Sequence, residues 1–245
     1  MSNELTGYFA NHLQELRKRV LISFIAIFVA TATAYYFSEQ IVGHFVAPLV
    51  AAHPDLANLV YTNLTEAFVA YLKVSLLVGL VVSFPVCGYQ FWKFVAPGLH
   101  QNEKQVTRHL VFWGTLLFAC GVAFAYFVVL PKMLSFLLSF VSERLEPLPK
   151  LDAYLTFVSR TVLTFGLSFE IPFLMVMATK VGVVRKGYFA RQRKYFYIAI
   201  VVLSFLLAVG DLLSTVMLAV PLFGLYEIGI LISRPFKGKV EPEGN

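Results

Sequence analysis

Long apolar stretches separated by short polar segments dominate the hydropathy pattern of this 245-residue chain. A helix needs about 20 mostly apolar residues to cross the hydrocarbon core of a bilayer. Six stretches reach or approach that length, at residues 20–37, 65–89, 110–130, 153–179, 195–209 and 212–232. The pattern therefore predicts an all-α, polytopic integral membrane protein with six transmembrane helices, of which the last two are short.

The beginning of the chain admits two interpretations. Apolar residues recur at helical spacing from Leu5 to Val20, which predicts an amphipathic segment over residues 4–19 that leads into the first span. Basic residues followed by an apolar stretch and Ala32-Thr33-Ala34 are also typical of a cleavable signal peptide. We favour a retained helix, within a single transmembrane domain at residues 1–233 that is followed by a short basic tail at 234–245.

Composition excludes most other classes of protein. Hydrophobic residues make up 58% of the chain and charged residues 14%, whereas about a quarter of the residues in a soluble domain are charged. Two cysteines cannot form a disulfide scaffold. The net charge of +6 could suit nucleic acid, but the basic residues occur in short blocks between apolar stretches, so we expect no nucleic-acid partner.

These basic blocks also predict the orientation of the chain. Most of the 20 lysines and arginines lie before the first span, after the second, fourth and sixth spans, or at their ends, and residues 38–64 contain none. Because cytoplasmic loops carry an excess of lysine and arginine, both termini are predicted to be cytoplasmic.

Acidic residues inside the predicted spans need a physical explanation because charges in a membrane are costly. Glu170 lies in the fourth span beside Pro172, without a basic residue one helical turn away. It could contact another membrane helix or bind a proton, or it could be a neutral or hydrogen-bonded carboxyl; we favour a functional role. For Glu227, near the cytoplasmic end of span six, we favour a structural pairing with a basic loop residue. Asp211 suits an N-cap of span six.

Two further acids, Glu15 and Glu103, lie at the cytoplasmic boundary among many basic residues. Glu15 lies beside Arg17 in the sequence. Such acids often form internal salt bridges, which contribute about 0–1 kcal/mol when exposed. Alternatively, two carboxylates near lipid could capture guanidinium groups through bidentate hydrogen bonds. The spacing alone leaves open whether the two converge.

The sequence lacks the motifs of common enzymes: it has no His-Glu-x-x-His, Gly-x-Ser-x-Gly, Walker or Rossmann pattern. Its five histidines are scattered without the spacing of metal ligands. We therefore expect no enzymatic activity, no metal and no cofactor.

Several short motifs follow one another along nearly the whole chain, and their order is more specific than any one of them. They are HLQELRKR (12–19), Pro48, TEAF (65–68), FPV (84–86), YQFWKF (89–94), APGL (96–99), FAYF (124–127), FGLSFEIP (165–172), Pro221 and LYEIG (225–229). Together they resemble the TatC family, the multispanning subunit of the twin-arginine protein translocase. One departure is Gly210, because the family usually has prolines just before the residue that matches Asp211.

The resemblance implies a receptor in the bacterial inner membrane that binds twin-arginine signal peptides of folded cargo proteins. It implies that the peptide-binding residues are Glu15, Arg17, Phe94 and Glu103. It further implies that Glu170 meets single-span partner subunits, with which the chain assembles for export driven by the proton-motive force, as a homo-oligomer within a larger complex. Positions with a structural or functional role would be Pro48, Tyr126, Asp211 and Glu227.

Two other functions are alternatives to a translocase receptor. A proton-coupled small-solute transporter could use Glu170 as its carrier group, but such proteins often contain internal repeats, and none is evident here. A passive membrane scaffold would not bind signal peptides.

Overall fold

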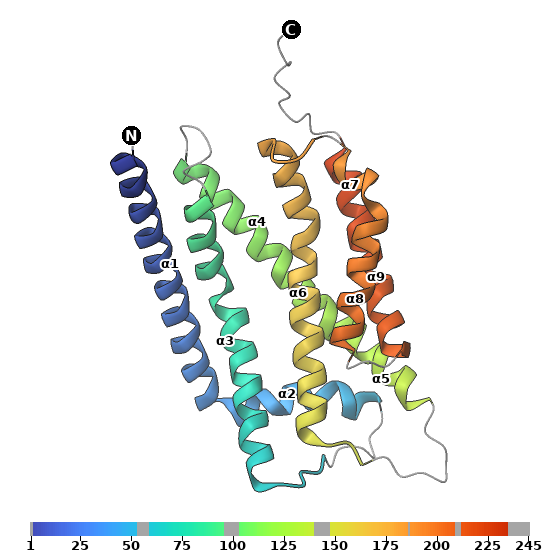
Figure 1. Ribbon diagram of the computed structural model, residues 1–245. Helices are drawn as coiled ribbons and strands as arrows, with labels where there is room; N and C mark the ends of the chain where they lie inside the picture. Colours follow the sequence, from blue (N-terminus) through green and yellow to red (C-terminus); the bar gives the residue numbers. More distant parts are fainter. Residues whose placement is uncertain are drawn as a thin grey trace. The chain divides into compact units, whose positions relative to one another are not determined.

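The structure is a computed structural model, and it describes residues 2–52, 59–95, 103–139, 148–185, 187–208 and 212–234. Within these ranges the backbone is mostly helical and contains no strand beyond an isolated bridge between Val60 and Lys150, which agrees with the all-α prediction (Figure 1). The elements are α1 (Ser2–Tyr36), α2 (Ser38–Ala52), α3 (Leu64–Val95), α4 (Glu103–Phe124), the π-helical η3 (Ala125–Val129), α5 (Leu130–Leu138), α6 (Leu151–Val181), α7 (Tyr188–Arg191), α8 (Arg193–Leu207) and α9 (Leu212–Ser233).

Five helical segments, one of which runs through α4, η3 and α5, are long and apolar enough to cross a membrane, which confirms a multi-pass, all-α protein. The segments are His12–Tyr36, Thr65–Phe94, Arg108–Leu138, Leu151–Val181 and Ser214–Ser233. The predicted fifth span corresponds to α8, which has 15 residues. At 1.5 Å per residue α8 is about 22 Å long, shorter than the roughly 30 Å hydrocarbon core. The count of six spans therefore stays a prediction.

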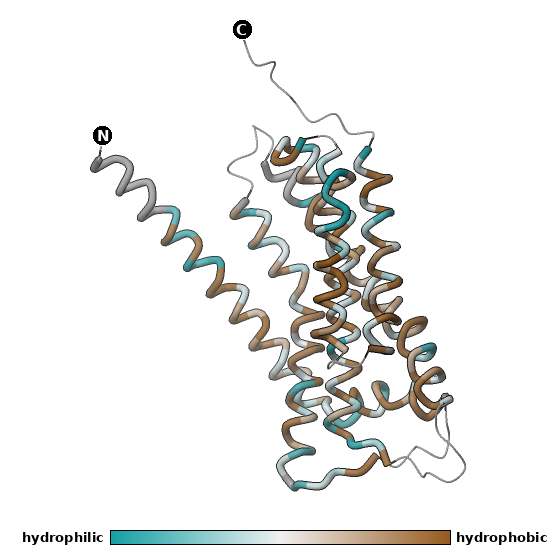
Figure 2. The backbone as a smooth tube through the Cα atoms, turned by 45° about the vertical axis from the view of Figure 1, so that its right-hand side comes forward, coloured by the Kyte–Doolittle hydropathy of each residue, from teal (hydrophilic) through white to brown (hydrophobic). Residues whose placement is uncertain are grey.

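The chain divides into two compact units, which are described separately. The first comprises Met1–His44 and Asn63–Leu116, and the second comprises Phe45–Thr62 and Leu117–Asn245. The predicted amphipathic segment at residues 4–19 continues without a break into the first span as a single helix, α1. Within the coloured part of α1, Figure 2 shows hydrophilic residues first and more hydrophobic ones farther along.

The first unit is built on α1 and α3, which pack against each other along their length in opposite directions (Figure 1). Gly79 on α3 makes this close approach feasible: a Cβ atom at Gly79 would lie 2.8 Å from the Cα of Thr31 on α1. Within lipid no hydrophobic effect drives helices together, so their association depends on close van der Waals packing. Small residues permit this packing because they let the two backbones approach each other.

The second unit is centred on α6, which packs against α9. Small residues again mark close approaches: a Cβ at Gly121 would lie 2.9 Å from the Cα of Gly166, and one at Gly229 would lie 3.1 Å from the Cα of Pro172. Helix α6 ends at Gly182, whose φ of 85° lies in the left-handed region that favours glycine.

Four hydroxyl groups inside α6 are satisfied within the helix itself. Thr161, Thr164, Ser168 and Thr179 each donate a hydrogen bond to the carbonyl four residues earlier, at 2.6–2.9 Å. This pattern lets polar side chains lie in an apolar environment at little cost, because each donor finds an acceptor on its own helix.

Helix α2 is the main element that the hydropathy pattern did not predict, since residues 38–64 lie between the first two predicted spans. Its second half belongs to the second unit, where the Tyr154 hydroxyl donates to the Phe45 carbonyl at 2.9 Å. Val60, which follows α2 in the chain, lies beside the start of α6. Its amide donates to the Pro149 carbonyl, and its carbonyl accepts from the Leu151 amide. These two bonds attach the segment around Val60 to the beginning of α6.

Candidate functional site

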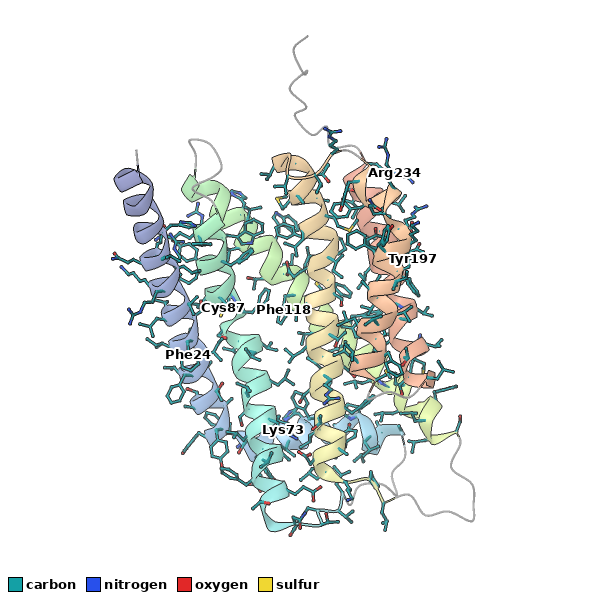
Figure 3. All side chains as sticks on the ribbon, viewed as in Figure 1. Phe24, Lys73, Cys87, Phe118, Tyr197 and Arg234 are labelled. Atoms are coloured by element: carbon teal, nitrogen blue, oxygen red, sulfur yellow. The ribbon has the colours of Figure 1, made fainter. Side chains whose placement is uncertain are left out.

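Two adjoining cavities lie between the middle of α1 and the last part of α3, within the first unit. The polar pocket has a volume of about 370 Å³ and is lined by Gln14, Glu15, Lys18, Arg19, Ile22, Gln90 and Lys93. The apolar groove has a volume of about 320 Å³ and is lined by Leu16, Arg19, Val20, Ser23, Phe24, Ile27, Cys87, Gln90, Phe91 and Phe94. Arg19 and Gln90 line both. Figure 3 labels Phe24 on α1 and Cys87 on α3.

An ion pair between Glu15 and Arg19 forms the junction of the two cavities. The Arg19 Nη2 donates to Glu15 Oε1 across one helical turn, and its Nη1 donates to the Gln90 carbonyl of α3 at 3.4 Å. The Arg19 side chain is only 10% exposed, whereas that of Glu15 is 40% exposed. Arg19 is therefore fixed against α3, while the carboxylate of Glu15 remains accessible from the pocket.

Phe94 marks the end of the apolar groove that lies near the N-terminal part of α1. Its ring stacks on the imidazole of His12, with the centroids 4.5 Å apart and the planes at 22°. Beside it, the Lys93 ammonium lies 5.8 Å from the centre of the Tyr89 ring. Aromatic stacking between α1 and α3 thus holds the two helices together at the edge of the site.

Of the four predicted peptide-binding residues, the structure brings Glu15 and Phe94 to these adjoining cavities. Arg17 is exposed on α1 and belongs to the lining of neither one. Glu103 is the first residue of α4, but its side chain lies outside the described residues. Whether Glu103 converges with Glu15 therefore stays a prediction.

Glu15 lies beside Arg17 in the sequence, but in the structure it pairs with Arg19. The physical reason is helical geometry, because residues four apart share a face whereas residues two apart do not. The i,i+4 spacing of Glu15 and Arg19 could have revealed the pair. No sequence signal identified His12 or Gln90, whose roles depend on the packing of α1 against α3.

Glu170 lies in the interior of α6, one turn from the exposed Leu167 and Leu174. It is half-buried, and its Oε1 atom is buried without a hydrogen-bond partner among the described residues. An unpaired polar atom in an apolar setting is costly. Glu170 therefore has capacity for a further polar contact.

Glu227 on α9 accepts hydrogen bonds from Arg193 Nη2 at 2.7 Å and from the Tyr197 hydroxyl, both at the beginning of α8. The expected partner of Glu227 was a basic loop residue, whereas Arg193 is the first residue of α8. The ion pair joins α8 to α9 at one end, which fits a structural role. Next to it, the Tyr226 hydroxyl donates to the Phe189 carbonyl of α7 at 2.8 Å. These contacts fasten α7 and α8 to α9.

The remaining predicted positions lie elsewhere. Pro48 is buried within α2, and Tyr126 lies in η3, where its ring meets that of Phe45 edge-on with centroids 6.3 Å apart. Asp211 lies outside the described residues. Within the described ranges, no three His, Cys, Asp or Glu side chains are grouped so that they could hold a metal ion.

Long apolar helices that pack through small residues, with a polar pocket where α1 meets α3, define a multi-pass membrane protein. Residues 11–221 match the model of the family described as Sec-independent protein translocase protein (TatC). The chain therefore belongs to the TatC family, as the motifs had indicated. Members of this family are components of a protein translocase and not enzymes, so the small-solute transporter is left without support.

Relatives confirm this assignment over nearly the full length. The TatC protein of Desulforapulum autotrophicum is 37% identical, over 96% of this chain and 87% of the relative. The TatC protein of Escherichia coli K12 is 35% identical, over 98% of this chain and 93% of the relative. A crystal structure of a twin arginine translocase receptor, TatC, is 37% identical and matches with a TM-score of 0.84, covering 91% of this chain and 98% of the other.

Proposed function

We propose that this chain is the receptor subunit of a twin-arginine translocase in the bacterial inner membrane, with six spans and both termini in the cytoplasm. It binds the twin-arginine signal peptides of folded cargo proteins at the cytoplasmic face, and it assembles with single-span partner subunits for export driven by the proton-motive force. The observation that carries the proposal is the accessible carboxylate of Glu15 in the polar pocket, flanked by Lys18 and Lys93.

Recognition follows from the chemistry of this pocket. A carboxylate offers about four acceptor sites, and Arg19 contacts one of its oxygens. A guanidinium from the peptide can bind Glu15 bidentately, and the second arginine of the pair binds Glu103 in the same way. Lys18 and Lys93 repel cations that do not reach a carboxylate, so scattered lysines in a peptide are rejected. Phe94 contacts the apolar residues that follow, and Arg17 supports the same face.

The test measures the binding of a twin-arginine peptide to membranes that contain Glu15→Gln, with Glu39→Gln on α2 as the matched control. Hydrogen bonds to charged groups contribute about 1.5–3 kcal/mol, so Glu15→Gln should weaken binding at least about tenfold. The control should bind as the natural chain does, because Glu39 is exposed and does not line the pocket. Equal affinity in Glu15→Gln and the control would refute the proposal.

A double-mutant cycle tests whether the two acids act together. If Glu15 and Glu103 bind the two arginines of one peptide, the combined Glu15→Gln and Glu103→Gln variant should lose less affinity than the sum of the single losses. Peptides with one arginine replaced by lysine should be affected unequally by the two single variants. If the two losses of affinity were fully additive, and if each single variant affected both lysine-substituted peptides equally, Glu103 would not belong to this site.

The second part of the proposal concerns Glu170, whose Oε1 atom lacks a partner within the described part of the chain. A polar group on the transmembrane helix of a partner subunit would satisfy it. A photo-crosslinker at position 170 should therefore trap a small single-span protein. Crosslinks to lipid alone, together with normal export by Glu170→Ala, would contradict this part without affecting the signal-peptide site.

A further inference from the structure

The part of the apolar groove that extends from Phe94 toward Ile27 is not used by the proposed peptide contacts. Along α1 the groove extends from Arg19 to Ile27, and Cys87 and Phe91 of α3 line its other side. Eight residues of helix correspond to about 12 Å. The hydrocarbon core is about 30 Å thick, so the groove is nearly as long as one leaflet is deep.

The charge at the entrance of this groove is positive. Glu15 and Arg19 neutralise each other, and Lys18 and Lys93, which are both exposed, also line the polar pocket. No other acid belongs to the lining of this pocket among the described residues. A ligand that fits both cavities therefore has an anionic head and an apolar tail.

We propose that the polar pocket and the apolar groove together bind one anionic phospholipid. Its phosphate lies between Lys18 and Lys93 above Arg19, and one acyl chain fills the groove down to Ile27. Ammonium and guanidinium groups bind phosphate through charge-assisted hydrogen bonds, and basic pockets between membrane helices are suited to anionic headgroups. This proposal does not depend on the peptide contacts of Glu15.

The shape of the groove suits an acyl chain. The groove has a volume of about 320 Å³ and follows α1 for about 12 Å. A single hydrocarbon chain is thin enough to lie along it, and Phe24, Ile27 and Phe91 offer it an apolar surface.

The test uses the full chain in phosphatidylcholine nanodiscs that contain a small fraction of photoreactive lipid, with the reactive group in the middle of an acyl chain. Photoreactive phosphatidylglycerol should label groove residues such as Phe24 and Phe91, in preference to the same probe with a phosphatidylcholine head. Both probes should label Leu21, Ile25 and Phe28 equally, because these exposed side chains of α1 do not line the groove.

The Lys18→Gln/Lys93→Gln variant tests the headgroup contact. Each lysine near a membrane surface attracts an anionic lipid about fivefold, so the preference of the groove for phosphatidylglycerol should fall about thirty-fold or disappear. Lys180→Gln/Lys194→Gln, which changes two exposed lysines on α6 and α8, is the matched control and should retain the preference. Glu15→Gln should lose the signal peptide and retain the lipid, which separates this proposal from the previous one.

Cys87 provides a second measurement that does not depend on crosslinking. In a Cys120→Ser chain, Cys87 is the remaining cysteine, and phosphatidylglycerol should slow its alkylation by a maleimide relative to phosphatidylcholine. The Lys18→Gln/Lys93→Gln substitution should abolish this protection. Equal groove labelling by both probes, or an unchanged preference in that variant, would overturn the proposal.

Discussion

Replacing Gly79 by alanine should separate α1 from α3 and thereby damage both cavities. The added Cβ would lie 2.8 Å from both the Cα and the backbone N of Thr31, so the clash involves backbone that no side-chain rotation can relieve. An ordinary contact needs about 3.4 Å or more, so the helices must move apart by roughly half an ångström. Overpacking of this kind costs about 1–3 kcal/mol.

Gly88→Ala is the matched control on the same helix, because a Cβ there meets nothing within 4 Å. Alanine is favoured over glycine in a helix by about 1 kcal/mol, so this variant should be neutral or more stable. For a chain of this size, 1 kcal/mol corresponds to about 2–4 °C in Tm. We therefore expect Gly79→Ala to unfold several degrees below Gly88→Ala in detergent.

Three measurements make this prediction specific. Gly79→Ala should also bind the twin-arginine peptide more weakly and expose Cys87 to faster alkylation, since the groove opens. Adding Thr31→Ala should restore stability only in part, because it removes the contact with Oγ1 and leaves the backbone contacts. If Gly79→Ala matched Gly88→Ala in both Tm and alkylation rate, the close approach of α1 and α3 would be wrong.

Three further predictions concern the rest of the chain. Gly121→Ala should destabilise the second unit by about 1–3 kcal/mol, measured by thermal unfolding, whereas Gly224→Ala, in open space, should not; equal values would contradict the tight crossing of α4 and α6. Glu227→Gln should loosen α8 by breaking the ion pair with Arg193, and hydrogen exchange at the start of α8 should rise; unchanged exchange would argue against that pair as a fastening. A reporter fused after Asn245 should be active in the cytoplasm, and activity on the outer side would refute the proposed orientation.

The helices of this protein could be predicted from the sequence because each span is a long run of apolar residues, and lipid requires the backbone to bond within itself. Helix α2 was not predicted, because 15 residues with a proline at position 48 resemble neither a span nor an amphipathic surface helix. Its helical form depends on contacts with distant residues, such as the bond from Tyr154 to Phe45.

The site was predicted less completely. Glu15 and Phe94 were identified through their motifs, but their neighbours were not, because Gln90 and His12 acquire roles only when α1 meets α3. Gly79 had no significance in the sequence until the structure placed Thr31 against it. Local spacing carries information about one helix, whereas the cavities are formed by two.

The Glu15–Arg19 ion pair has a consequence for cargo release. Under the proposed function, an arriving arginine shares the Glu15 carboxylate with Arg19, so its hydrogen bonds compete with one that the receptor already makes. Arg19, held nearby by the Gln90 carbonyl, stays in place to reclaim the carboxylate when the peptide leaves. An internal competitor of this kind shortens the residence time of the signal peptide, which suits a receptor that must release each folded cargo protein before it binds the next.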